Sequence, residues 1–146
     1  MIESFWWIIY VMKNNQPYFL VIKRQAISKK IEWTAPKWKA ISGENPVQTA
    51  KREIFEETNL KENLLIEKWK LWDFIISFPE NSFNKKVTYF LFEYKWDTDD
   101  VKIIDSEWYI WVYNWLPINK VINLISYQWL REIYRKWYMI VMNLNE

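Results

Sequence analysis

The sequence predicts an α/β or α+β fold built on a mixed β-sheet. Runs rich in aromatic and β-branched residues outnumber segments with helical spacing, but both kinds are present along the chain. No internal repeat and no long linker divides them. Because a length of 146 residues suits one domain with one core, we expect a single domain over residues 1–146.

The N-terminal part predicts a β-hairpin followed by a loop. Residues 5–12 and 18–24 are apolar runs typical of strands, and the turn-like residues 13–17 separate them. Residues 33–44 combine Pro, Gly and Lys with several small or polar residues, a composition typical of a loop. We therefore expect two paired strands and then an irregular segment.

A helix is predicted over residues 45–58. Asn45 is a suitable N-cap, and Pro46 suits the first helical position because the N–H that it lacks would be unpaired there anyway. Asn59 can end the helix in the left-handed conformation. The face expected to pack on the core carries residues spaced i, i+3 and i+7, namely Val47, Ala50 and Ile54.

The C-terminal half predicts further strands and two closing helices. Residues 64–78, 86–95 and 108–115 are strand-like, being rich in aromatic and β-branched residues. Residues 117–126 and 129–140 have the spacing and the start signal of helices. Strands thus outnumber helices, as expected for a fold centred on one sheet.

The composition excludes several kinds of catalytic residue and metal ligand. The chain has no Cys and no His, which excludes disulfides, thiolate nucleophiles, imidazole bases and the usual zinc ligands. Any bound metal should then be a hard cation held by oxygen. The net charge of +2 gives no reason to expect a stable nucleic-acid partner. A secretory signal and an apolar run of about 20 residues are both missing, so we expect a cytoplasmic protein without a membrane span.

Three carboxylates crowd one flank of the predicted helix. Glu53, Glu56 and Glu57 fall within an arc of roughly 100°, because each helical residue advances about 100°. Their mutual repulsion would be relieved by Arg52 or by a divalent cation. Oxygen-only clusters suit Mg²⁺ or Mn²⁺ bridging to phosphates. Taken alone, a Glu-rich helix is more often simply a solvated face.

The spacing of a longer segment resembles the Nudix box, the motif of a family of pyrophosphohydrolases. Seven of its nine fixed positions match in register, and two positions, Trp38 and Asn59, depart because the family has Gly there. The approach from Trp33 to Lys37, the strand after Lys85 and the segment from Tyr113 to Pro117 also resemble the family. The matching box residues are Glu44, Arg52, Glu53, Ile54, Glu56, Glu57 and Leu60.

The resemblance implies a fold and a role for each site residue. The implied fold is a mixed sheet between helices. Glu53, Glu56 and Glu57 would bind Mg²⁺ or Mn²⁺ with a main-chain carbonyl near Trp38, while Arg52 orients the carboxylates and Glu44 assists. The catalytic base would be a box glutamate or Glu107. The residues that hold phosphates or stack on the base would be Lys37, Lys85 and Tyr89, unless these are surface lysines and a core tyrosine.

The resemblance also implies a reaction. Water would attack a phosphorus of a small nucleotide in which a nucleoside diphosphate is linked to another group. The segments quoted above are most similar to asymmetric diadenosine tetraphosphate hydrolases. Nucleoside-triphosphate and RNA 5′-pyrophosphate hydrolases of the family remain alternatives, as does a module that binds nucleotides without hydrolysing them. The chain would act as a monomer or a homodimer.

The tryptophan content is abnormal. The chain has 12 Trp and a single Gly, where about 7% Gly is usual. If Trp33 and Trp115 match true family tryptophans and the other ten are read as glycine, the glycine count rises from one to eleven. We interpret most of the tryptophans as glycines encoded by UGA, a codon that some lineages read as Gly and others as Trp. The alternative is a genuinely Trp-rich protein, and UGG codons at positions 6, 7 and 38 would favour it. The clearest cases, where the family has Gly, are Trp6, Trp7, Trp38 and Trp137.

Overall fold

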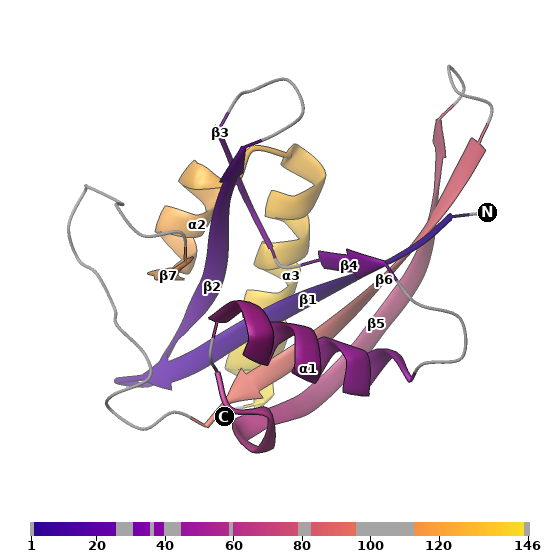
Figure 1. Ribbon diagram of the computed structural model, residues 1–146. Coiled ribbons are helices and arrows are strands. Elements are labelled where there is room, and N and C mark those ends of the chain that lie inside the picture. Colours follow the sequence, from indigo (N-terminus) through magenta and orange to yellow (C-terminus); the bar gives the residue numbers. More distant parts are fainter. Residues whose placement is uncertain are drawn as a thin grey trace.

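A mixed β-sheet lies between helix α1 on one face and helix α3 on the other in the computed structural model (Figure 1). The structure describes residues 2–25, 31–35, 37–39, 45–58, 60–78, 83–95 and 113–144. The elements are β1 (Ile2–Lys13), β2 (Gln16–Gln25), β3 (Ile31–Thr34), β4 (Lys37–Lys39), α1 (Pro46–Thr58), the 3₁₀ turn η1 (Glu62–Leu64), β5 (Leu65–Phe78), β6 (Phe83–Tyr94), β7 (Tyr113–Pro117), α2 (Ile118–Leu124) and α3 (Gln128–Leu144).

The predicted hairpin is confirmed, with a tighter turn than expected. Lys13 pairs with Gln16, so only Asn14 and Asn15 form the turn, and both have positive φ, at 54° and 61°. Asn tolerates the left-handed region better than most residues, and a two-residue turn of this kind matches the twist of the strands. Gln16 and the residue after it, expected in the linker, belong to β2 because the tight turn allows pairing to start at once.

The mixed character of the sheet comes from one parallel pair. β1 runs parallel to β6 from Ile2 to Tyr10, whereas the other strand pairs are antiparallel. The order along the sheet is β3-β2-β1-β6-β5, with β4 on β1 and β7 on β2. The predicted α+β class with a mixed sheet between helices is confirmed.

The prediction of a loop over residues 33–44 is wrong for its first part. Residues 33 and 34 end β3 and residues 37–39 form β4, while residues 40–44 lie outside the described part of the chain. The register explains why. Ile22 pairs with both β3 and β7, and Ser4 pairs with both β4 and β6. β3 and β4 therefore fill the fork between β1 and β2, where distant main-chain partners make them strands.

Both faces of the sheet are buried. Trp6, Ile8 and Tyr10 point from β1 into a core shared with α2 and α3. The alternate residues of β1 enter a second core that includes Ala50 and Ile54 of α1. A strand covered on both faces reads as an unbroken apolar run rather than as an alternating one, which explains the sequence of β1.

The C-terminal helices are confirmed, and the last one is longer than predicted. α3 buries Leu130, Tyr134, Trp137 and Val141, one side chain for each turn. The strand expected over 108–115 is described from residue 113 and extends to 117, and its earlier residues lie outside the described part. Among the described helices, none combines the length and the apolar character needed to cross a membrane.

Candidate active site

Helix α1 begins and docks as its sequence predicts. The Oδ1 atom of Asn45 accepts hydrogen bonds from the main-chain N–H groups of Val47 (2.9 Å) and Gln48 (3.4 Å), so Asn45 is the N-cap. Pro46 is the first helical residue. Ala50 and Ile54 are fully buried in the core beneath the helix, with Val47 packed against its edge. The predicted apolar stripe is confirmed.

The C-terminal end of α1 is tied to the sheet. The hydroxyl of Thr58 donates to the carbonyl of Ile54 at 2.5 Å and accepts the N–H of Leu60 at 3.3 Å. Leu60 is buried in the same core, and the N–H of Lys61 donates to the hydroxyl of Tyr94 at 3.2 Å. Both ends of the helix are thus fixed, although the predicted cap Asn59 lies outside the described residues.

The acidic flank of α1 carries one described ion pair. Nη1 of Arg52 lies 3.3 Å from Oε1 of Glu56, and the two side chains are 44% and 53% exposed. In solvent such an i, i+4 pair contributes only about 0.3–0.5 kcal/mol, so it adds little to the stability of the fold. Glu53 and Glu57 occupy the predicted positions of the helix, three residues before and one residue after Glu56.

This donor set fits a hard divalent cation. Carboxylates spaced i, i+3 and i+4 on one helix share a flank, and the chain offers no thiolate or imidazole ligand to compete. The side chains that the structure describes contain no group of three acidic residues close enough to hold a metal. The fit therefore rests on the observed helix and on the residue types at positions 53, 56 and 57.

Backbone register sorts the other predicted site residues between the two faces of the sheet. Trp38 pairs with Phe5. Phe5 is two residues before Trp7 and so lies on the same face of β1, and Trp7 faces α1. Position 38 is therefore on the face of α1 as well. Lys37 pairs with Trp6, and Trp6 pairs with Tyr89 across β1 and β6. Positions 37 and 89, and position 85 four residues before Tyr89, therefore share the face of α2 and α3.

Tyr89 lies in the core rather than at the surface. It is buried, and its ring stacks on Trp6 with the centroids 6.4 Å apart and an interplanar angle of 29°. Burial raises the pKa of Tyr89 well above its usual value, so its hydroxyl is a neutral hydrogen-bonding group at ordinary pH.

A second set of contacts, around the connection between α2 and α3, was not predicted from the sequence. The hydroxyl of Tyr127 donates to Oε1 of Glu32 at 2.6 Å. Trp33 and Ser126 exchange two hydrogen bonds, N–H to Oγ at 3.2 Å and N–H to carbonyl at 3.3 Å. These partners are 93 and 95 residues apart, so no local pattern announces them.

Three predicted or candidate features fall elsewhere. Glu44 and Glu107 lie outside the described residues. A surface hollow of about 690 Å³ borders α1, but Lys51 and Phe55, which line it, are about 160° around the helix from Glu53 and Glu57. It is therefore on the flank away from the acidic residues. Its other lining residues are Lys61, Glu62 and Asn63.

The NUDIX domain family matches residues 6–138. Because this match spans nearly the whole chain, including all of α1, the chain belongs to the NUDIX family. It shares its fold with an Ap4A hydrolase and with a Nudix hydrolase of known structure. No curated protein sequence matches it.

Solved structures show how widely this fold is shared. An Ap4A hydrolase from C. elegans, in a binary complex, has a TM-score of 0.73 and 21% identity, over 98% of this chain and 99% of that one. RenU, a Nudix hydrolase from M. smegmatis, has a TM-score of 0.71 and 12% identity, over 98% of this chain and 88% of that one. The dihydroneopterin triphosphate pyrophosphohydrolase of E. coli has a TM-score of 0.63 and 17% identity, over 94% of both chains.

Proposed function

We propose that this protein is a Mg²⁺-dependent hydrolase of dinucleoside polyphosphates such as diadenosine tetraphosphate. The observation that carries the proposal is α1: a capped helix, docked through Ala50 and Ile54, on which positions 53, 56 and 57 fall on one flank. The likeness in fold to the C. elegans Ap4A hydrolase over almost its full length supports this substrate class within the family.

The proposed division of roles follows the two faces of the sheet. Glu53, Glu56 and Glu57, with the main-chain carbonyl near Trp38, would hold Mg²⁺, which supplies charge neutralisation at the phosphates and lowers the pKa of attacking water. Arg52 keeps Glu56 oriented through their ion pair. A carboxylate, Glu107 or a box glutamate, would accept the proton that the attacking water loses.

The lysines complete the proposed site. Position 37 in β4 and position 85 in β6 share a face of the sheet with Tyr89. This face is opposite that of α1, so their ammonium groups would bind the phosphates farthest from the proposed metal, and a substrate with several phosphates would be needed to reach both groups. Small nucleotides, rather than nucleic acids, are the substrates that this arrangement suits.

Product analysis on a substrate panel tests the proposal. The chain is incubated with Mg²⁺ and, separately, diadenosine tetraphosphate, nucleoside triphosphates and 5′-triphosphate RNA. Release of ATP together with AMP from the first substrate is the expected result. Faster release of pyrophosphate or phosphate from triphosphates or RNA would contradict the proposed substrate class and favour one of the alternative activities. Tight nucleotide binding without turnover of any substrate would favour a binding module.

The protein tested should include the variant Trp38→Gly. An indole beside the proposed metal and phosphates would hinder their approach, whereas glycine lets the main chain come close to a ligand. The panel is therefore run on both forms, so that slow turnover by the chain as written is not mistaken for a different substrate class.

A further inference from the structure

The hollow beside α1 combines an aromatic ring with positive charge at a place that the proposed reaction does not use. Its volume is about 690 Å³. Lys51 and Phe55 line it from α1, where their i, i+4 spacing makes them neighbours on the helix surface. Lys61 and Asn63 line it from the η1 turn. Because the hollow lies on the flank of α1 away from the box glutamates, a ligand here would not contact the proposed metal.

Phe55 offers an aromatic face to this hollow. Its ring is 44% exposed, although the preceding residue, Ile54, is fully buried. Among the described contacts, Phe55 meets no other aromatic ring. A flat ligand that stacks on Phe55 would cover apolar surface that now faces solvent. A single exposed ring is ordinary at a protein surface, so the neighbouring charges decide what this one can bind.

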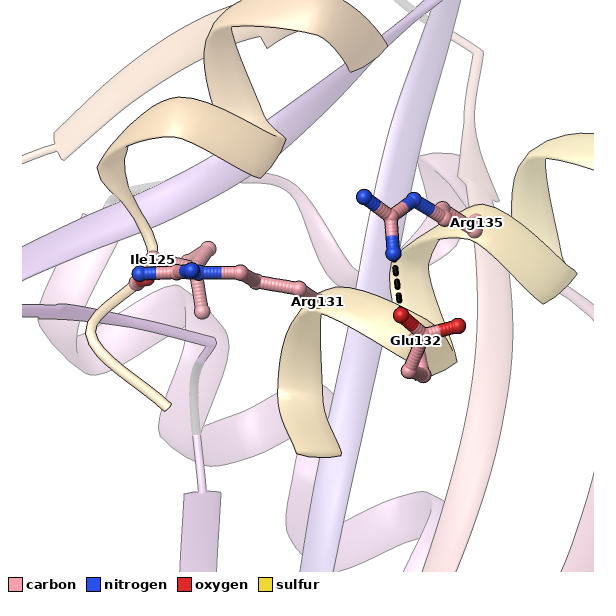
Figure 2. A network of polar contacts seen from close by, with 4 residues as sticks. All are labelled: Ile125, Arg131, Glu132 and Arg135. Carbon is pink, nitrogen blue, oxygen red and sulfur yellow. Dashed lines mark hydrogen bonds and ion pairs between the residues drawn. The ribbon is translucent and has the colours of Figure 1, made fainter. Parts of the chain in front are cut away.

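An anionic ligand needs a cation that the protein does not already use. On α3, Nε of Arg131 donates to the carbonyl of Ile125 at 2.7 Å, and Arg135 pairs with Glu132 (Figure 2). These guanidinium groups are therefore engaged. Lys51, in contrast, has no ion pair and no hydrogen bond from its side chain among the described contacts. Its ammonium group is available at the hollow.

The η1 side of the hollow is held in place by main-chain contacts. The N–H of Lys61 donates to the hydroxyl of Tyr94 at 3.2 Å, and its carbonyl accepts the N–H of Leu64 at 3.1 Å. The carbonyl of Leu64 accepts the N–H of Lys95 at 2.8 Å, and Leu60 is buried in the core. A site that is formed before its ligand arrives loses less conformational entropy on binding.

We propose that this hollow binds a mononucleotide, with the base stacked on Phe55 and the phosphate held by Lys51 and Lys61. Two lysines against one glutamate give the lining an excess of positive charge, and the amide of Asn63 can donate and accept hydrogen bonds at a base edge. Ligand pockets commonly have a volume of this order. The inference rests on the proposed function for the source of the ligand, because hydrolysis of a dinucleoside tetraphosphate releases mononucleotides.

The bound nucleotide would touch both α1 and η1. It would therefore add contacts between the proposed catalytic helix and the turn that follows it, on the side opposite to the reaction. A ligand that binds only the folded chain stabilises it in proportion to the logarithm of its concentration. A released product would in this way stabilise the docking of α1 without entering the acidic flank.

Calorimetry in EDTA tests the site, because EDTA excludes turnover and metal-held phosphate at the acidic flank. The probes are AMP, ribose 5-phosphate, which lacks the base, and adenosine, which lacks the phosphate. Phe55→Ala should weaken AMP about tenfold or more and leave ribose 5-phosphate unchanged. Lys51→Gln should weaken AMP and ribose 5-phosphate about threefold and leave adenosine unchanged. Lys120→Gln, on α2 across the sheet, is the matched control and should change none of them.

The outcomes separate this site from the proposed function. A parent chain with no measurable affinity for AMP, or an affinity that neither Phe55→Ala nor Lys51→Gln lowers, overturns the site even if the chain hydrolyses diadenosine tetraphosphate. If Phe55→Ala does not fold, Phe55→Leu removes the ring and keeps the apolar bulk, and an unchanged affinity for AMP overturns the site equally. The expected pattern in a chain that hydrolyses no dinucleoside polyphosphate supports the site and contradicts the proposed function alone.

Discussion

Ile54 is the side chain on which the docking of α1 depends most. It is fully buried, and the only other fully buried side chain described on the helix is the small Ala50. Val47 lies at the edge of the core and the remaining described side chains of α1 are partly or fully exposed. Substituting Ile54→Ala therefore removes most of the apolar contact between the proposed catalytic helix and the sheet.

The size of the effect follows from this burial. Ile54→Ala removes three carbon atoms, worth about 2.4 kcal/mol at 0.8 kcal/mol for each buried CH₂, before any term for the cavity that remains. Substitutions of this type cost about 2–5 kcal/mol in total. A domain of this size is stable by about 5–15 kcal/mol, so we expect a variant that still folds but has a Tm lower by roughly 5–15 °C.

Urea unfolding followed by tryptophan fluorescence measures this difference in free energy. Phe55→Ala is the control, because the neighbouring ring is half-exposed and should cost much less. A loss below about 1 kcal/mol for Ile54→Ala, or a loss equal to that of the control, would refute the docking of α1 through its apolar stripe.

Three further outcomes are expected. Asn45→Ala should lower the free energy of unfolding by about 1 kcal/mol, measured by urea unfolding, because two N–H groups lose their acceptor; an unchanged midpoint would contradict the cap. The stability that Tyr10, Tyr89 and Tyr134 contribute should be constant up to about pH 10 and then fall by up to about 1.4 kcal/mol per pH unit for each of them. Burial raises the pKa of these phenols in the folded state. The stability that they contribute is therefore complete below their unfolded pKa and is lost as the pH rises toward the folded value. A tyrosine-to-phenylalanine variant with the same alkaline slope would contradict this. Trp38→Gly should turn over substrate faster than the chain as written, and equal rates would refute the interference attributed to the indole.

The sequence predicted the parts of the fold that depend on local pattern. The cap, the first residue and the apolar stripe of α1 follow from residues close to one another, and so does the hairpin around Asn14 and Asn15. β3 and β4 could not be predicted this way, because they are strands only through pairing with β1 and β2 across the fork. Charge and proline content made the same residues resemble a loop.

The candidate site also has one part that local sequence predicts and another that depends on distant contacts. The spacing of Glu53, Glu56 and Glu57 is visible in sequence because it lies on a single helix. The burial of Tyr89 against Trp6 depends on the parallel pairing of two strands more than 80 residues apart, and the bond between Tyr127 and Glu32 spans 95 residues. Contacts at such separations leave no periodic signal in the sequence.

Trp137 bears on the interpretation of the tryptophans. Its side chain is fully buried in the core beneath α3, and its indole N–H has no hydrogen-bond acceptor in the described structure. A buried donor left unpaired costs about 1–3 kcal/mol. Glycine at position 137 would not carry this cost, but inside a helix it costs about 1 kcal/mol relative to alanine and it gives up the buried indole.

The central claim is that the acidic flank of α1 carries the hydrolysis, and the rate of Glu57→Gln tests it most directly. The variant is compared with the parent chain and with Glu62→Gln, the same change on η1 at the hollow away from the proposed site. With saturating Mg²⁺ and diadenosine tetraphosphate, we expect kcat to fall by about 100-fold or more for Glu57→Gln and to stay within about twofold for Glu62→Gln. Equal rates for the two variants, with both proteins folded, would contradict the claim.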